Sequence, residues 1–510
     1  MPERGRLCRG LPGDQMAGEM KTGIQKSIRT DGKEGARQWL LLCAFLLFFG
    51  ILWYLSPIGI YPDSGSYISL QSGREPLYPL FLVFFRLLFR EKDTIVWLAA
   101  SGQLDSEKAM ELINTWPALR VTVFVQSVAA AAACWYLTMV IRKVFALNGA
   151  LTILTGLCTL IPYVVTPLAS SSHMVLNKAV LTEGLTFPMS AVYTGCMIKG
   201  LLEQDQKAKH YGSALIWALL LVLTRNQMLV TLAVWLVVVY FEILKSRRWK
   251  LFFLPLLCLV AFMGCKTLCG RFYGLFAHEG YQGASTGSYN LLTTLLYLSD
   301  AEDASLLTDD TMRELFQEMH GRMEAQGMTR ADAPEGILQR AYHYEEYYDR
   351  IGFDIQQPCL FGYAEAQGIA DGQALNAVIA ITTRMVRELF PGLAGAYLSN
   401  YLATVVSGLT RSVAASGVIM GIYAAVIYFL AAALMLYLFR KDRQSKAALL
   451  MLFTLLLIFA NVFATALMIM CLSRYMIYHT ALFYIAGLMC LRELWVRYVM
   501  TVSARQTSLL

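Results

Sequence analysis

Asp63 is the residue of this chain best placed to do chemistry, because it lies in the short segment YPDSGSY directly after the first long apolar run. An ionisable residue beside a membrane span is a functional candidate, and a carboxylate there could take the proton of an attacking hydroxyl group. The same segment is also typical of a turn followed by a helix cap, in which Asp63 or Ser64 would accept backbone hydrogen bonds. The segment by itself leaves both interpretations open.

Arginines interrupt or follow several of the apolar runs, and Arg225 and Arg474 each break what would otherwise be one longer stretch. A guanidinium group presents a planar fork of donors that suits phosphate oxygens, so these residues could bind an anionic lipid substrate. Each arginine taken singly is more typical of an interfacial anchor. The candidates for binding a lipid phosphate or a donor are Arg74, Arg225, Arg474 and Tyr475.

Other polar and aromatic residues are expected on the same membrane face, where they could line a cavity. They are Tyr67, Tyr78, His173, Lys178, Glu183 and Arg411. Taken singly, His173 is more typical of a surface or packing residue, since no metal partner stands at a recognisable spacing. A divalent cation could be held between Asp63 and Glu183, but we predict neither a metal nor another cofactor.

The composition indicates that membrane-spanning helices position these residues. Of the 510 residues, 57% are hydrophobic and 15% are charged, and the mean hydropathy is +0.50, which is too apolar for a set of ordinary soluble domains. A run of about 17 to 25 apolar residues crosses a bilayer as a helix. We therefore predict an all-α polytopic membrane protein with about ten transmembrane helices, at 39–57, 119–141, 144–165, 185–197, 211–224, 227–244, 251–268, 413–439, 447–470 and 476–494.

Basic residues concentrate in alternate loops between these runs. Because cytoplasmic loops carry the excess of lysine and arginine, this pattern predicts that both termini are cytoplasmic and that Asp63 lies on the exoplasmic face. The net charge of +7 is then explained by topology. No nucleic-acid-binding module is visible, so we expect no nucleic acid among the partners.

Changes of composition divide the chain into five parts. They are a basic cytoplasmic tail (1–37), a first membrane part (38–268) with spans one to seven and an outside loop (59–118), an exoplasmic polar insertion with juxtamembrane helices (269–411), a second membrane part with spans eight to ten (412–495) and a cytoplasmic tail (496–510). Within the outside loop, the apolar piece 76–89 is too short to span a bilayer and is predicted to lie on the membrane surface or to be re-entrant.

The insertion is predicted to be mainly helical. Met312, Leu315, Phe316 and Met319 have the spacing of one face of an amphipathic helix. The segment 341–354 carries several tyrosines among acidic residues. These tyrosines could stack against a sugar or pack on the membrane surface, and the sequence leaves both interpretations open.

Five short elements resemble the GT-C superfamily of integral-membrane glycosyltransferases, which includes the protein O-mannosyltransferases and the lipid A aminoarabinose transferases. They are the Asp63 segment after the first span, GREPLYP at 73–79, TEGL at 182–185, the break TRN at 224–226 and RY at 474–475 before the final span. As architecture the resemblance covers most of the chain. The chain departs from the pattern in two places: Asp63 is followed by Ser64 where many members have a second acidic residue, and the insertion has no matching motif.

The resemblance implies that Asp63 is a general base, that the sugar donor is carried on a polyprenyl phosphate, and that arginines bind the donor phosphate. We therefore expect an inverting transfer to an envelope glycan, lipid or protein acceptor, on the exoplasmic face of the plasma (cytoplasmic) membrane. A non-enzymatic transporter or flippase of a lipid-linked sugar and a structural assembly partner stay open as alternatives. Transporters commonly hold ionisable groups near the bilayer midplane, whereas the pattern here places them at one face, which favours surface chemistry.

Overall fold

The computed structural model describes residues 35–71, 73–90, 94–103, 112–169, 173–247, 251–277, 287–369 and 371–507. It is all helical, with 82% helix and no strands over the described residues, which confirms the predicted all-α class. Residues 1–34 of the predicted basic tail lie outside the described part, as do 278–286 of the predicted insertion and 508–510 at the other end. The predicted tail and domain boundaries therefore stay predictions.

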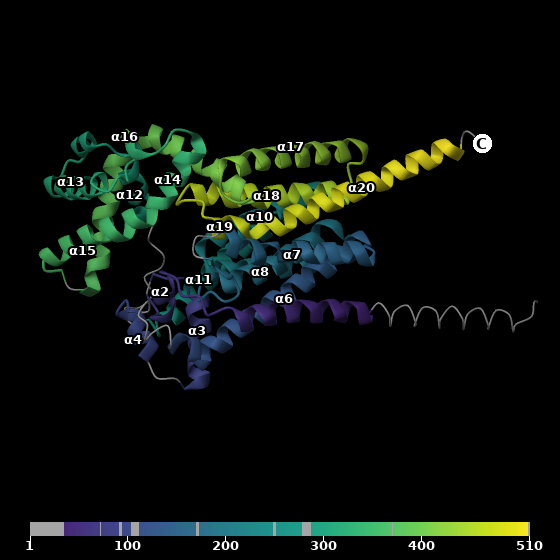
Figure 1. Ribbon diagram of the computed structural model, residues 1–510, viewed down its shortest axis with the longest axis horizontal. Coiled ribbons are helices and arrows are strands. Elements are labelled where there is room, and N and C mark those ends of the chain that lie inside the picture. Colours follow the sequence, from purple (N-terminus) through teal and green to yellow (C-terminus); the bar gives the residue numbers. More distant parts are fainter. Residues whose placement is uncertain are drawn as a thin grey trace, which may run out of the picture.

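Eight described helices are long and apolar enough to cross a membrane. They are the first apolar helix (Gly35–Leu55), α6 (Pro117–Phe145), α7 (Gly149–Ala169), α10 (Leu229–Lys245), α11 (Leu254–Tyr273), α16 (Asp371–Arg411), α17 (Val418–Lys441) and α18 (Lys446–Ala466). Several of them run side by side along the long axis of the molecule (Figure 1). The chain is a multi-pass helical membrane protein.

Three further helices lie at predicted spans but are not among the eight that are long and apolar enough to cross a membrane. They are α8 (Glu183–Leu202), α9 (Lys207–Thr224) and α20 (Thr480–Thr507). Helix α8 is buried along most of its length and packs between α6 and α9. A helix surrounded by other helices can carry small and polar residues, because its side chains contact protein rather than lipid. The count of ten spans stays a prediction.

The insertion forms a second helical layer at one end of the bundle (Figure 1). It contains α12 (Gly287–Leu298), α13 (Asp310–Glu324), α14 (Ile337–Arg350), α15 (Gln357–Ala366) and the long α16, which share a hydrophobic core separate from that of the bundle. The predicted amphipathic stripe is confirmed, because its four residues are all buried on α13. Tyr344 and Tyr348 of the tyrosine-rich segment also pack into this core. Helix α16 was expected within the insertion, yet its length and hydropathy also suit a span.

The predicted outside loop lies at the same end of the bundle as the insertion (Figure 1). It forms α2 (Ser64–Ile68), α3 (Leu77–Phe89) and α4 (Thr94–Ala100) among its described residues. Helix α3 is the apolar piece that we predicted to be too short to span, and it packs against α6. Phe84, Leu87 and Leu88 stay exposed on its other side. Whether this side contacts the membrane surface stays a prediction.

Candidate functional site

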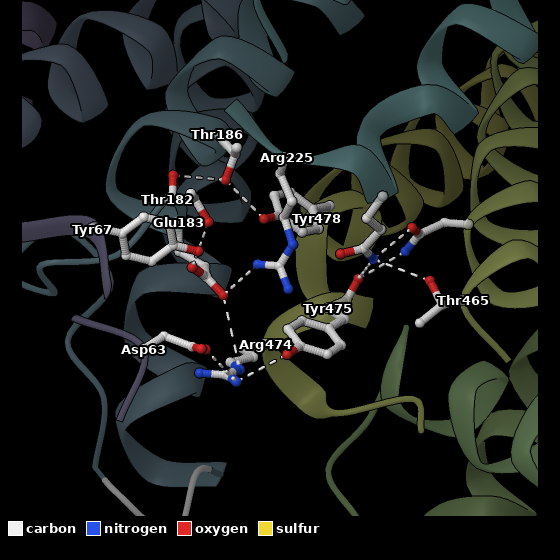
Figure 2. A network of polar contacts seen from close by, with 12 residues as sticks. Asp63, Tyr67, Thr182, Glu183, Thr186, Arg225, Thr465, Arg474, Tyr475 and Tyr478 are labelled. Carbon is white, nitrogen blue, oxygen red and sulfur yellow. Dashed lines mark hydrogen bonds and ion pairs between the residues drawn. The ribbon is translucent and has the colours of Figure 1, made fainter. Parts of the chain in front are cut away.

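Four segments that are far apart in the sequence bring their charged residues to one place (Figure 2). Asp63 immediately precedes α2, Glu183 begins α8, Arg225 joins α9 to the short helix η1 (Asn226–Met228), and Arg474 lies in α19 (Ser473–Met476). The first two are aligned by a parallel bridge between Gly59 and Ala179, in which the Gly59 N–H donates to the carbonyl of residue 178 at 3.0 Å and the Gly59 carbonyl accepts from the N–H of residue 180 at 2.9 Å. Each acidic residue lies four positions after its residue of the bridge.

Arg474 connects the two carboxylates of the site. Its Nη2 lies 3.6 Å from Asp63 Oδ2 and its Nε lies 3.9 Å from Glu183 Oε1. Asp63 is also paired with Arg74, at 2.6 Å, and Glu183 with Arg225, at 2.6 Å. Three guanidinium groups therefore surround two carboxylates, and these five side chains carry a net positive charge. We call them the charge cluster.

Tyr475 lies between two arginines of the charge cluster. The Arg225 guanidinium carbon is 4.2 Å from the centre of its ring and that of Arg474 is 4.9 Å, so both cations contact the aromatic face. Arg474 Nη2 also donates to its hydroxyl oxygen at 2.9 Å. The Tyr475 carbonyl accepts from Gln227 Nε2 at 3.1 Å and from Asn461 Nδ2 at 2.8 Å. These two side-chain amides fix the backbone of Tyr475.

The backbone hydrogen bond of the turn-and-cap interpretation is made by Ser64 and not by Asp63, because Ser64 Oγ accepts from the Tyr61 N–H at 3.0 Å. Asp63 occupies the N-cap position of α2, but its carboxylate makes no capping hydrogen bond. Burial acts to raise the pKa of Asp63, but the guanidinium groups of Arg74 and Arg474 outweigh it and hold the pKa below the ordinary value for aspartate. The group is therefore ionised at neutral pH.

Two of the predicted cavity tyrosines, Tyr67 and Tyr78, pack in sequence against Arg74 of the charge cluster, Tyr67 directly and Tyr78 through Tyr67. The Arg74 guanidinium contacts the ring of Tyr67, with 4.8 Å from its carbon to the ring centre. Tyr78 is fully buried, packs edge-on against Tyr67 and donates to Gln126 Oε1 at 3.1 Å. Tyr67 therefore supports Arg74 directly, and Tyr78 supports Tyr67.

Three other predicted cavity residues lie apart from the charge cluster. His173 Nδ1 is exposed and 3.0 Å from the carbonyl of residue 167, and Lys178 donates to the Trp53 carbonyl at 2.8 Å. Arg411 is paired with Glu345 of α14, and its Nη1 donates to the Cys471 carbonyl at 2.9 Å. Arg411 thus fastens the insertion to the segment that leads into α19.

Asp349 is a site residue that the sequence analysis did not select. It lies on α14 and interacts electrostatically with both Arg474 and Asp63. Burial raises the pKa of Asp349, Arg474 partly offsets that effect, and the negative charge of Asp63 raises the pKa further. Two carboxylates of different basicity therefore interact electrostatically with one guanidinium group. Only the tyrosine-rich pattern of 341–354 marked this helix in the sequence.

The ion pair between Lys266 and Glu75 helps to link the segments that carry Arg74 and Arg225. Lys266 of α11 lies with its Nζ 3.2 Å from Glu75 Oε1 and donates to Asn226 Oδ1 at 2.7 Å. Glu75 directly follows Arg74, and Asn226 directly follows Arg225. One ammonium group therefore fixes both backbone segments. A lysine within an apolar helix was the sequence signal that could have found it.

Replacing Lys266 with methionine should lower the free energy of unfolding by about 3 kcal/mol, because the Glu75 side chain, only 5% exposed, would stay buried without a cation. Thermal unfolding of the purified protein in detergent measures this change. The double variant Lys266→Met with Glu75→Leu should recover most of the loss. If the double variant is no more stable than the single one, the pair is not the cause.

Neither a protein-family model, nor a curated protein, nor a solved structure matches this chain. The GT-C resemblance therefore rests on the short sequence elements given above. Among the residues that the structure describes, no group of three or more histidine, cysteine or acidic side chains could hold a metal ion. The function has to be argued from the charge cluster.

Proposed function

We propose that this chain is a membrane glycosyltransferase that moves a sugar from a polyprenyl-phosphate donor to a hydroxyl group of an exoplasmic acceptor, with Asp63 as general base. One observation supports it most: Asp63 converges with Arg74 of the same loop and with Arg474, which belongs to a distant segment of the chain. A carboxylate beside a group of arginines suits a reaction in which a hydroxyl loses a proton and a phosphate gains negative charge.

In the proposed reaction the acceptor oxygen forms a bond to the anomeric carbon, and the bond from that carbon to the phosphate oxygen breaks. The bonding electrons go to the phosphate, where Arg225 and Arg474 stabilise the negative charge, and the hydroxyl proton goes to Asp63. The phosphate is a good leaving group, so no strong general acid is needed. Attack opposite the leaving group inverts the anomeric centre.

Because Asp63 is paired with arginines that would bind the donor phosphate, binding of the donor would change the pKa of Asp63. Arg74 and Arg474 pair with Asp63, which lowers the basicity of its carboxylate. A phosphate group that draws these guanidinium groups away would raise the pKa of Asp63. The carboxylate would then become a better proton acceptor when the donor is in place.

A transporter or flippase of a lipid-linked sugar is the second candidate, and one observation favours it. The pair of Lys266 and Glu75 places charge on α11, a helix that is otherwise apolar enough to span a membrane. Ionisable groups within membrane helices commonly mark substrate pathways. Transport would leave the sugar on its lipid, whereas transfer removes it.

The two candidates are separated by following both the lipid and the sugar. The purified protein is placed in vesicles with a sugar-labelled polyprenyl phosphate and extracts of envelope acceptors. Release of free polyprenyl phosphate together with labelled acceptor is the expected result. Movement of intact donor across the bilayer, with no loss of the sugar, would instead establish the transporter.

The pH dependence of transfer should identify the base. If Asp63 is the base, kcat/KM reports its pKa in the free protein and should fall only as the pH drops below about 4, the ordinary range of aspartate. Replacing Arg74 with glutamine should move this acidic limb upward by about one pH unit, because a stabilising cation is lost. If kcat/KM instead falls at a pH above the ordinary range of aspartate, and Arg74→Gln does not change that pH, the general base is Asp349, whose pKa is raised.

A further inference from the structure

A separate pocket lies at the end of the first apolar helix. Its volume is about 400 Å³, and it is lined by residues 53–58 together with Asn114, Arg120 and Lys178. The bridge between Gly59 and Ala179 runs beside it, so the pocket adjoins the two segments that lead to the charge cluster. None of the arginines of the charge cluster lines the pocket.

Two cations face this pocket from different segments. The Lys178 side chain is buried, and its Nζ lies 5.6 Å from the centre of the Trp53 ring. The Arg120 guanidinium carbon lies 5.9 Å from the same ring. The lining contains no acidic residue, and no described carboxylate is in ion-pair contact with either cation. The two positive charges therefore lack a counter-charge from the described chain.

Two other features show that an anion would be stabilised in the pocket. Helix α6 begins at Pro117 beside it, with no acidic residue in its first turn and no side-chain cap, and a helix N-terminus favours negative charge. Burial, together with the charge of Arg120, lowers the pKa of Lys178 to about 8. A bound anion would offset both the burial and the repulsion between the two cations.

Capping of the first helix explains only part of this arrangement. Lys178 donates to the Trp53 carbonyl at 2.8 Å, which satisfies one acceptor at the helix end. An ammonium group has three donors, so this bond leaves others for a ligand. Arg120 makes no contribution to that cap; its exposed side chain contacts the Trp53 ring and lines the pocket.

We propose that this pocket binds the phosphate group of an anionic lipid headgroup. The rim favours a lipid over a free ion, because Tyr54 and Leu55 are 81% and 71% exposed where the apolar helix ends. Acyl chains could lie along these side chains while the phosphate contacts Lys178 and Arg120. This inference does not depend on the proposed glycosyl transfer, and its test measures binding alone.

The test uses the full-length protein in a neutral detergent, titrated with phosphatidylglycerol, with phosphatidylcholine and with inorganic phosphate, and follows bound species by native mass spectrometry. Phosphatidylglycerol should bind in preference to phosphatidylcholine. The variants Arg120→Gln and Lys178→Gln should each bind it about tenfold more weakly, since each removes a charge-assisted hydrogen bond. Arg271→Gln is the matched control, because this exposed arginine of α11 is not part of the pocket.

The variants keep the proposal open to refutation. Arg120→Gln leaves the cap made by Lys178 in place, so it separates ligand binding from folding. Equal binding of phosphatidylcholine, or unchanged phosphatidylglycerol binding by Arg120→Gln, would overturn the site. Competition by inorganic phosphate would support recognition of the phosphate group itself. If inorganic phosphate binds tightly and no lipid binds, the ligand of the pocket is free phosphate, and the proposal of a lipid headgroup is wrong.

Discussion

Arg225→Gln is expected to lower the free energy of unfolding by about 3 to 5 kcal/mol and to abolish transfer. The Glu183 side chain is only 2% exposed, and the Arg225 guanidinium lies 2.6 Å from it. Removing the cation would leave a buried carboxylate whose desolvation is no longer compensated by this pair. It would also remove the contact with the face of Tyr475, at 4.2 Å. Arg474, at 3.9 Å from Glu183, is too far to replace the lost hydrogen bond.

Thermal unfolding and transfer activity are measured together for this variant. Arg322→Gln is the matched control, because Arg322 and Glu318 form an ion pair that is about half exposed (48% and 47%) and should contribute about 0 to 1 kcal/mol. The double variant Arg225→Gln with Glu183→Gln should be more stable than Arg225→Gln alone but still inactive. Equal stability of the Arg225 and Arg322 variants would show that the buried pair does not hold the site together.

The helical character of the fold could be predicted from local sequence, but its membrane boundaries could not. The apolar runs are visible by their length and hydropathy, and the stripe on α13 by its helical spacing, so both can be found in a short window of sequence. Helix α8 is surrounded by other helices, and its polar residues reflect tertiary packing that hydropathy does not encode. The length of α16 has a similar cause, since it packs with the insertion and also meets the bundle through α17 and α18.

The charge cluster could be predicted in part because its members border or interrupt apolar sequence. Asp63 was selected because it follows the first apolar run, and Arg225 and Arg474 because they break longer ones, and the structure brings the three together. Asp349 was not selected, because it lies in a polar segment where acidic residues are common and only the folding of α14 places it near Arg474. Arg411 satisfied the same sequence criterion as Arg474, but it pairs with Glu345 instead. The position of one residue along the sequence does not predict which residue it contacts in the folded protein.

Asp63→Asn is expected to reduce kcat for transfer by about 10²- to 10⁴-fold, the usual contribution of a positioned general base. Asparagine has nearly the same shape and can still accept the hydrogen bond from Arg74, which lies 2.6 Å from the carboxylate, while Arg474 lies 3.6 Å from the same group. It cannot take up the proton of the acceptor hydroxyl. Binding of the donor should therefore persist while turnover is lost.

The decisive comparison for Asp63→Asn is with two other carboxylates in the same transfer and donor-binding assays. Asp310→Asn is the control, because its side chain is 86% exposed on the insertion, and it should retain full activity. Asp349→Asn should weaken use of the acceptor by a smaller factor, since that residue faces Arg474 from the insertion. If Asp349→Asn abolishes transfer while a stably folded Asp63→Asn protein turns over normally, the base is Asp349. In that case Asp63 would not act as a base and would only hold Arg74 and Arg474 in place. The charge cluster would then bind the donor phosphate and take no proton from the acceptor.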